Sequence, residues 1–252
     1  MLHYLFVACI IILYGLLAID AYGQQYRYRY IVWVAVLAHA YFLHQCIDGP
    51  LGQNLSVVNL FSLIAWLACF ILAFSPFSIA SLGVLIYPIA AVSLGLIAIL
   101  SSCFIVSTSH QPWALFHILW ATLVVGLFVL SGCQALLLAV QEQLLKRKKL
   151  TGLLQRLPPL QLMESALFTL VKLGVYALSI LLVASLFLFK VNHLPGLWSK
   201  ILLGGCVWGV FSGLLLGRHF LGWRGNTAVV WTLIGVVLAV GVYLGSHFLL
   251  LI

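Results

Sequence analysis

The stretch WALFHILWATLVVGLFVLSGCQALLLAVQ, residues 113–141, contains no Asp, Glu, Lys or Arg. About 20 consecutive apolar residues are enough for one helix to cross a lipid bilayer. An uncharged apolar run of this length is typical of a membrane span and not of the buried helix of a soluble protein. The stretch therefore predicts a transmembrane helix, and it sets the frame for the rest of the chain.

Seven further apolar stretches accompany it, so the sequence predicts an all-α, polytopic transmembrane helix bundle of about eight spans. The predicted spans are residues 2–20, 30–47, 55–74, 79–103, 113–141, 164–189, 199–218 and 227–252. Of the 252 residues, 65% are hydrophobic and only 6% are charged, whereas soluble domains carry about 25% charged residues. The spans leave no room for a soluble catalytic domain, and we expect one integral-membrane domain over residues 1–252.

The basic residues lie mainly in the loops on one side of the predicted bundle. Nine of them lie at or just after the ends of the first, fifth and seventh predicted spans: Arg27, Arg29, Lys146, Arg147, Lys148, Lys149, Arg156, Arg218 and Arg224. Only Lys190 and Lys200 lie on the opposite side. Because short loops rich in Lys and Arg stay in the cytoplasm, this distribution predicts that both termini lie outside. The formal net charge of +8 is then a topology determinant and does not indicate nucleic-acid binding.

Residues 142–164 form the longest polar segment, and we interpret them as a basic cytoplasmic hinge loop. Pro158 and Pro159 favour the end of one helix before the next begins near Glu164. Its Lys and Arg side chains are suited to contact anionic membrane lipid.

Five glycines, Gly204, Gly205, Gly209, Gly213 and Gly217, give the seventh span a stripe of small residues. Such a stripe favours close packing against a neighbouring helix.

Several classes of function are disfavoured by what the spans lack. Lys172 is the one charged residue placed well inside a predicted span, and paired intramembrane carboxylates of the kind used in proton relays are absent. This weakens a transporter interpretation. The H-E-x-x-H zinc motif and a nucleophile with an adjacent base are absent too, so we do not expect an enzyme. The six cysteines are scattered singly and are interpreted as small core residues.

Histidine is the polar residue that the chain uses within and beside its spans. Six histidines fall on the predicted outer side, namely His3, His44, His110, His117, His193 and His247. His39 lies near the middle of the second span and His219 lies on the cytoplasmic side. Neutral imidazole is a common axial ligand of haem iron, and nearby tryptophans (Trp33, Trp113, Trp120 and Trp198) could line a porphyrin. Hydrogen bonding of each histidine to a neighbouring helix is the alternative.

His117 is the best single candidate for a haem ligand. It lies about one turn inside the fifth span, near the outer surface. His39 and His44 are five residues apart, about 140° around a helix, so they cannot both face one site.

Several stretches resemble the YpjD-type inner-membrane proteins, a branch of the cytochrome c assembly superfamily that includes haem-handling proteins. These stretches are His39 with Ala40 and Leu43, GQNLSVVNLFSLIAW (52–66), HILWATL (117–123), LPPLQLME (157–164), GRHFLGWRGNTAVVW (217–231) and YLGS (243–246). They follow one another along most of the chain in the order expected for that branch.

The resemblance implies a bacterial inner-membrane protein of cytochrome c assembly that binds or presents haem near the outer face. His117 matches the first external haem-ligand histidine of the family. The tryptophan-rich WWD motif of the haem-presenting members corresponds here to residues 190–200, where Trp198 is the one tryptophan. The family's second external histidine has no match in this chain, so His247 or His39 is the candidate for the second ligand.

Two other functions stay open. A structural or regulatory subunit could keep this fold without handling haem, acting through a partner protein. A transporter of small molecules or ions is the weaker alternative.

Overall fold

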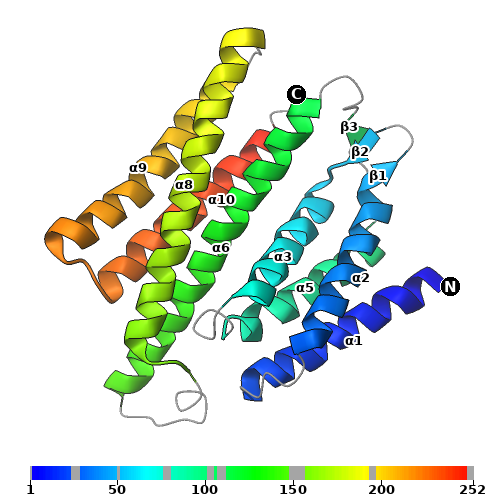
Figure 1. The fold of residues 1–252 in the computed structure, drawn as a ribbon, viewed down its shortest axis with the longest axis horizontal. Helices are drawn as coiled ribbons and strands as arrows, with labels where there is room; N and C mark the ends of the chain where they lie inside the picture. The colour runs from blue at the N-terminus through cyan, green and yellow to red at the C-terminus, as the bar shows by residue number, and fades with distance from the viewer. Residues whose placement is uncertain are drawn as a thin grey trace. The chain divides into compact units, whose positions relative to one another are not determined.

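The structure is a computed structural model that describes residues 2–23, 29–49, 52–75, 81–100, 105–106, 112–147, 157–192 and 197–248. These residues contain eight helices and three short strands (Figure 1). The helices are α1 (Leu2–Gly23), α2 (Arg29–Ile47), α3 (Val57–Phe74), α5 (Gly83–Ile99), α6 (Pro112–Lys146), α8 (Leu160–Asn192), α9 (Leu197–Leu221) and α10 (Asn226–Phe248). Each coincides with one predicted span, which confirms the polytopic all-α fold.

Seven of the described helices are long and apolar enough to cross a membrane. The eighth, α5, has 17 residues, at the lower end of the range of about 17–25 residues that span a bilayer. Pro88 lies inside α5 and removes one backbone hydrogen bond there.

The chain divides into two compact units. The first comprises residues 1–112 with 150–158, and the second comprises residues 113–149 with 159–252. The expectation of one domain over residues 1–252 stays a prediction.

The first unit contains α1, α2, α3 and α5, and a small antiparallel sheet continues from the end of α2 (Figure 1). Strands β1 (Asp48–Gly49), β2 (Gly52–Asn54) and β3 (Ile105–Val106) pair in that order. Gly52 has a φ of 136°, which side-chain-bearing residues rarely adopt, so glycine suits this turn. Asn59 in the first turn of α3 donates its side-chain amide to the Asn54 carbonyl at 2.8 Å. The sheet is thereby tied to the start of α3.

The second unit contains α6, α8, α9 and α10. Two side chains of α6 bond to the backbone of α8. Trp120 donates to the Ala177 carbonyl at 2.9 Å and Gln134 donates to the Met163 carbonyl at 3.0 Å. Because helices in lipid are held by packing and interhelical hydrogen bonds, these two bonds fix α6 against α8 at two separate levels.

The helices on either side of residues 142–164 extend into this predicted hinge loop. Helix α6 continues to Lys146, where the Lys146 ammonium pairs with Glu142 one turn earlier at 2.6 Å. Helix α8 begins at Leu160, and the Pro159 carbonyl accepts hydrogen bonds from Leu162 and Met163. Residues 148–156 lie outside the described part of the chain.

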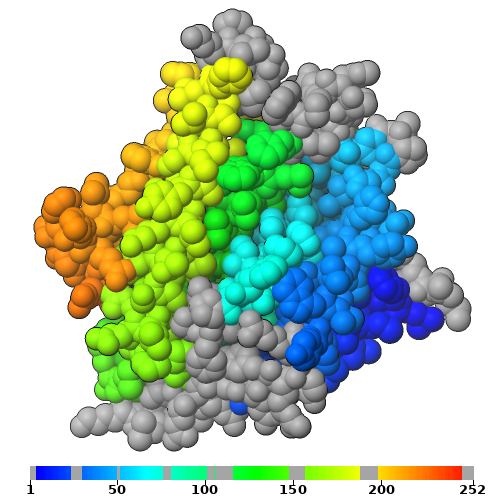
Figure 2. All heavy atoms as spheres, in the orientation of Figure 1, coloured from blue at the N-terminus to red at the C-terminus, as the bar shows by residue number. Residues whose placement is uncertain are grey.

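The surface of the second unit is apolar, as expected for contact with lipid. Helix α8 presents a row of exposed side chains at helical spacing, namely Tyr176, Ile180, Val183 and Phe187. Figure 2 shows the side chains of α8, in yellow-green, as a continuous ridge.

Candidate functional site

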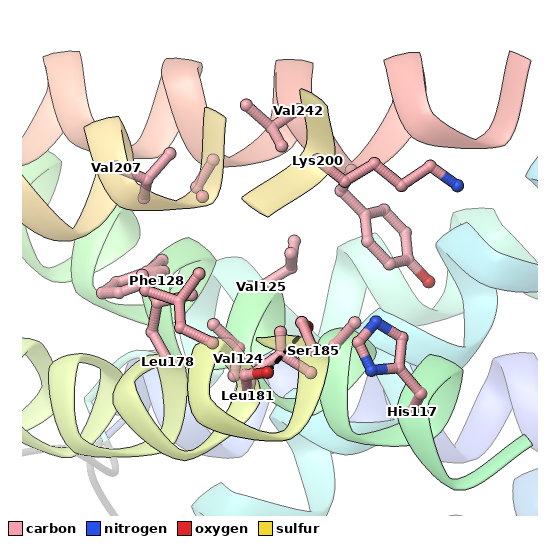
Figure 3. A pocket seen from close by; sticks show the side chains of 15 residues that line it. His117, Val124, Val125, Phe128, Leu178, Leu181, Ser185, Lys200, Val207 and Val242 are labelled. Atoms are coloured by element: carbon pink, nitrogen blue, oxygen red, sulfur yellow. Dashed lines mark hydrogen bonds between the residues drawn. The ribbon is translucent and has the colours of Figure 1, made fainter. Parts of the chain in front are cut away.

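A pocket in the second unit is lined by α6, α8, α9 and α10 (Figure 3). Its lining residues recur at helical spacing on one face of each helix: His117, Val124 and Phe128 in α6, Leu178, Leu182 and Ser185 in α8, Lys200, Gly204 and Val207 in α9, and Ala239, Val242 and Tyr243 in α10. Most of these side chains are apolar, so the few polar ones decide what the pocket can bind.

The pocket is polar at one end and apolar at the other. Figure 3 shows His117 and Lys200 at one end, with Phe128 and Leu178 at the opposite end. Lys200 is the one cationic side chain among the residues that line the pocket. Because His117 lies in the second turn of α6 and Lys200 in the first turn of α9, the polar end corresponds to the predicted outer ends of both helices.

The His117 imidazole has a ring nitrogen that is available for a further hydrogen bond or a ligand. Its Nδ1 atom is buried and has no hydrogen-bond partner among the described residues. The neighbouring Tyr243 hydroxyl is instead bonded to the Thr122 hydroxyl at 2.7 Å, which joins α6 to α10. A buried polar atom without a partner is uncommon and costs stability. A ligand that bonds to His117 Nδ1 would supply the missing partner.

The pocket volume is about 110 Å³. Pockets that enclose a drug-sized ligand measure about 300–1,000 Å³, and a porphyrin belongs to that size class. The imidazole of His117 therefore fits the chemistry of a haem ligand, while the enclosed space does not fit the whole macrocycle. A porphyrin held by His117 would keep most of its surface outside the pocket.

His39 lies in the first unit, where it is fully buried in a hydrogen-bonded chain. The Tyr14 hydroxyl bonds to His39 Nδ1 at 3.0 Å, and His39 Nε2 bonds to the Ser62 hydroxyl at 3.0 Å. Ser62 bonds to Ser93 at 3.1 Å, and Ser93 donates to the Ala90 carbonyl at 2.8 Å. The chain joins α1, α2, α3 and α5.

The direction of this chain follows from its last bond. Ser93 has one hydroxyl proton and donates it to a carbonyl, so it must accept from Ser62. Ser62 then accepts from the protonated Nε2 of His39, and Nδ1 accepts from Tyr14. Both ring nitrogens are thereby used, which favours a structural role for His39 over iron ligation.

The other predicted site residues have different surroundings. Trp198 is 51% exposed in the first turn of α9 and is not part of the pocket lining. The backbone of His247 lies one turn beyond Tyr243 in α10, but its side chain lies outside the described part of the structure. His44 is exposed and pairs with Asp48 at 2.5 Å. Among the described residues, no three His, Cys, Asp or Glu side chains come together as a metal site.

From the sequence, Lys200 is only one of two basic residues on the predicted outer side, and Tyr243 is not singled out. Lys200, Gly204 and Val207 follow one another at spacings of four and three residues, which indicates one helix face. That spacing could have placed Lys200 on an inward face, but the partner helices could not be read from it.

Comparison with known proteins gives the class of this chain. Residues 26–252 match the family described as Cytochrome C assembly protein. The chain is also 30% identical over 226 residues to the inner membrane protein YpjD of Escherichia coli strain K12, covering 85% of this chain and 82% of that protein. The YpjD proteins of Escherichia coli O6:H1 and O157:H7 match to the same extent. No solved structure matches the chain.

The protein therefore belongs to the cytochrome c assembly family and is a multi-pass protein of the inner membrane.

Proposed function

We propose that this protein binds or presents haem near the outer face of the inner membrane during cytochrome c assembly, without catalysing bond chemistry itself. The observation that carries the proposal is the His117 imidazole, which lines a pocket and has a buried Nδ1 atom without a partner among the described residues. Membership of the cytochrome c assembly family supports it. Haem would supply the iron porphyrin that cytochrome c maturation requires.

His117 is the axial ligand in this proposal, because neutral imidazole is a common ligand of haem iron. Trp198, exposed two residues before Lys200, would offer an aromatic face for the porphyrin. His247 is our choice for the second ligand, since its backbone position in α10 follows the pocket residue Tyr243 by one turn. His39 is the weaker choice because both of its ring nitrogens are hydrogen-bonded.

An absorption spectrum of the purified protein tests the proposal. We expect a Soret band in the wild type, and we expect His117→Ala to lower haem affinity by at least about 10-fold, as the loss of groups that support a metal ligand already does. His219→Ala is the matched control, because His219 is exposed at the opposite end of α9 and should leave the band unchanged.

Two results would overturn the assignment of His117 as the haem ligand. If His117→Ala keeps the full Soret band while the double change His39→Ala and His44→Ala abolishes it, the site lies on α2. If the wild type binds no haem, the structural or regulatory subunit becomes the better function. The small pocket volume of about 110 Å³ favours that second candidate.

A further inference from the structure

The pocket of the second unit contains Lys200, and the described residues place no side-chain carboxylate beside it. The chain has four acidic residues in all, namely Asp20, Asp48, Glu142 and Glu164. Among the described residues, the side-chain carboxylates form ion pairs with His44 and Lys146 only. Lys200 therefore has no side-chain carboxylate as a counter-ion in the described part of the chain.

The two acidic side chains of the second unit, Glu142 and Glu164, lie far from the polar end of the pocket along their helices. Glu164 belongs to α8, which also contributes Ser185 to the pocket, and these two residues are about 30 Å apart along the helix at 1.5 Å per residue. Glu142 is farther still from His117 along α6. Because hydrogen bonds between ionised groups are stronger than those between neutral groups, an anionic ligand beside the Lys200 ammonium would be favoured.

The remainder of the pocket is largely apolar. Beyond His117 and Lys200 it continues among Val125, Phe128, Leu178 and Val207. Ser185 is the exception in this part, but its hydroxyl already donates to the Leu181 carbonyl at 2.7 Å. An apolar cavity of about 150 Å³ accommodates a ligand as large as benzene, so about 110 Å³ suits a segment of a single alkyl chain.

We propose that this pocket binds a single-chain lipid with an anionic head, its head group paired with the Lys200 ammonium and its chain lying between α6, α8, α9 and α10. The proposal goes beyond haem handling and requires no iron. In this arrangement His117 lies beside the head group, and its buried Nδ1 atom offers a hydrogen-bonding position to it.

Photo-crosslinking in nanodiscs of phosphatidylcholine tests this proposal without any haem. The probes are a photoactivatable hexadecyl phosphate and the neutral photoactivatable hexadecanol, and the labelled peptides are identified by mass spectrometry. We expect the phosphate probe to label pocket residues of α6, α8, α9 and α10 more strongly than the alcohol does. An excess of phosphatidylglycerol, an anionic lipid with two chains, should not displace it.

Two substitutions separate the head group from the chain. Lys200→Met should weaken binding of the phosphate probe by about 10-fold, as expected for the loss of a charge-assisted contact, and should leave the weak labelling by the alcohol unchanged. Ala239→Phe should fill the apolar part of the pocket and abolish labelling by both probes. Lys172→Met is the matched control, because Lys172 is exposed on α8 and does not line the pocket.

Each variant should first show the unfolding temperature of the wild type. Equal labelling of the wild type and Lys200→Met would overturn the proposal, as would labelling spread evenly over lipid-facing residues such as Tyr176 and Val183. Displacement by phosphatidylglycerol would assign the charge of Lys200 to ordinary bilayer lipid and would also overturn it. Loss of haem in a separate Soret measurement has no bearing on these results, so the two proposals fail independently.

Discussion

His39 and His117 are the two predicted site histidines whose side chains are described, and their surroundings differ in one decisive respect. His39 is completely buried and uses both ring nitrogens in hydrogen bonds. His117 lines a pocket with a nitrogen that has no partner in the described part of the chain. The same side chain is therefore suited to structure in the first unit and to ligand binding in the second.

At this scale we predict that His39→Ala lowers the free energy of unfolding by about 2–5 kcal/mol. The change leaves a cavity and removes the acceptor of the buried Tyr14 hydroxyl. Unfolding of the purified protein in detergent measures it. Tyr14→Phe should cost less in the His39→Ala background than in the wild type, because the two side chains form one hydrogen bond.

His44→Ala is the control for this prediction. His44 is exposed and pairs with Asp48 on the surface, so its loss should change the free energy of unfolding by no more than about 1 kcal/mol. A similar cost for His39→Ala and His44→Ala would contradict the structural role of the buried chain.

At the scale of the elements, one aromatic stack joins all four helices of the second unit. The Phe128 and Phe211 rings are parallel, with centroids 4.0 Å apart. A Cβ atom at Gly174 of α8 would lie 2.5 Å from the Phe128 ring, and one at Gly235 of α10 would lie 2.6 Å from the Phe211 ring. The two glycines therefore allow α8 and α10 to close on the stack from either side.

We predict that Gly174→Ala lowers the free energy of unfolding by about 1–3 kcal/mol, the usual cost of overpacking. Gly209→Ala in α9 is the matched control, since a Cβ there meets nothing within 4 Å among the described residues. That control should be neutral or slightly stabilising, because alanine favours helix over glycine. Thermal unfolding in detergent compares the two, and equal destabilisation would contradict the close approach at Phe128.

The glycine stripe predicted in the seventh span packs closely against other described residues at only some of its positions. A Cβ at Gly217 would lie 2.3 Å from the Trp223 ring, and one at Gly204 would lie 3.0 Å from Leu182. At Gly205, Gly209 and Gly213 a Cβ would meet nothing within 4 Å in the described structure. Close packing within the chain therefore occurs at the ends of the stripe and not along its whole length.

At the scale of the whole molecule, the charges of the loops set the orientation of the protein in the membrane. We predict that both termini lie outside, because nine basic residues would then lie in cytoplasmic loops. Fusions of alkaline phosphatase and of a cytoplasmic reporter to the C-terminus measure this. Activity of the phosphatase is expected, whereas activity of the cytoplasmic reporter would contradict the orientation or the number of spans.

The eight helices and their approximate bounds could be predicted from the amino-acid sequence, because hydrophobicity is a local property that adds up along each span. His117 could likewise be placed near the end of a helix from its position in the apolar stretch that contains it. The family resemblance carried by segments such as HILWATL is also local, and the match over residues 26–252 confirms it.

Only the tertiary structure decided which side chains meet. The hydrogen bonds of His39 join residues 25 and 23 positions away, and Lys200 lines the same pocket as His117 from another helix. In a soluble helix the apolar face marks the side that turns inward. In a membrane the lipid-facing side is as apolar as the buried side, so the sequence does not reveal how each helix is rotated or which helices become neighbours.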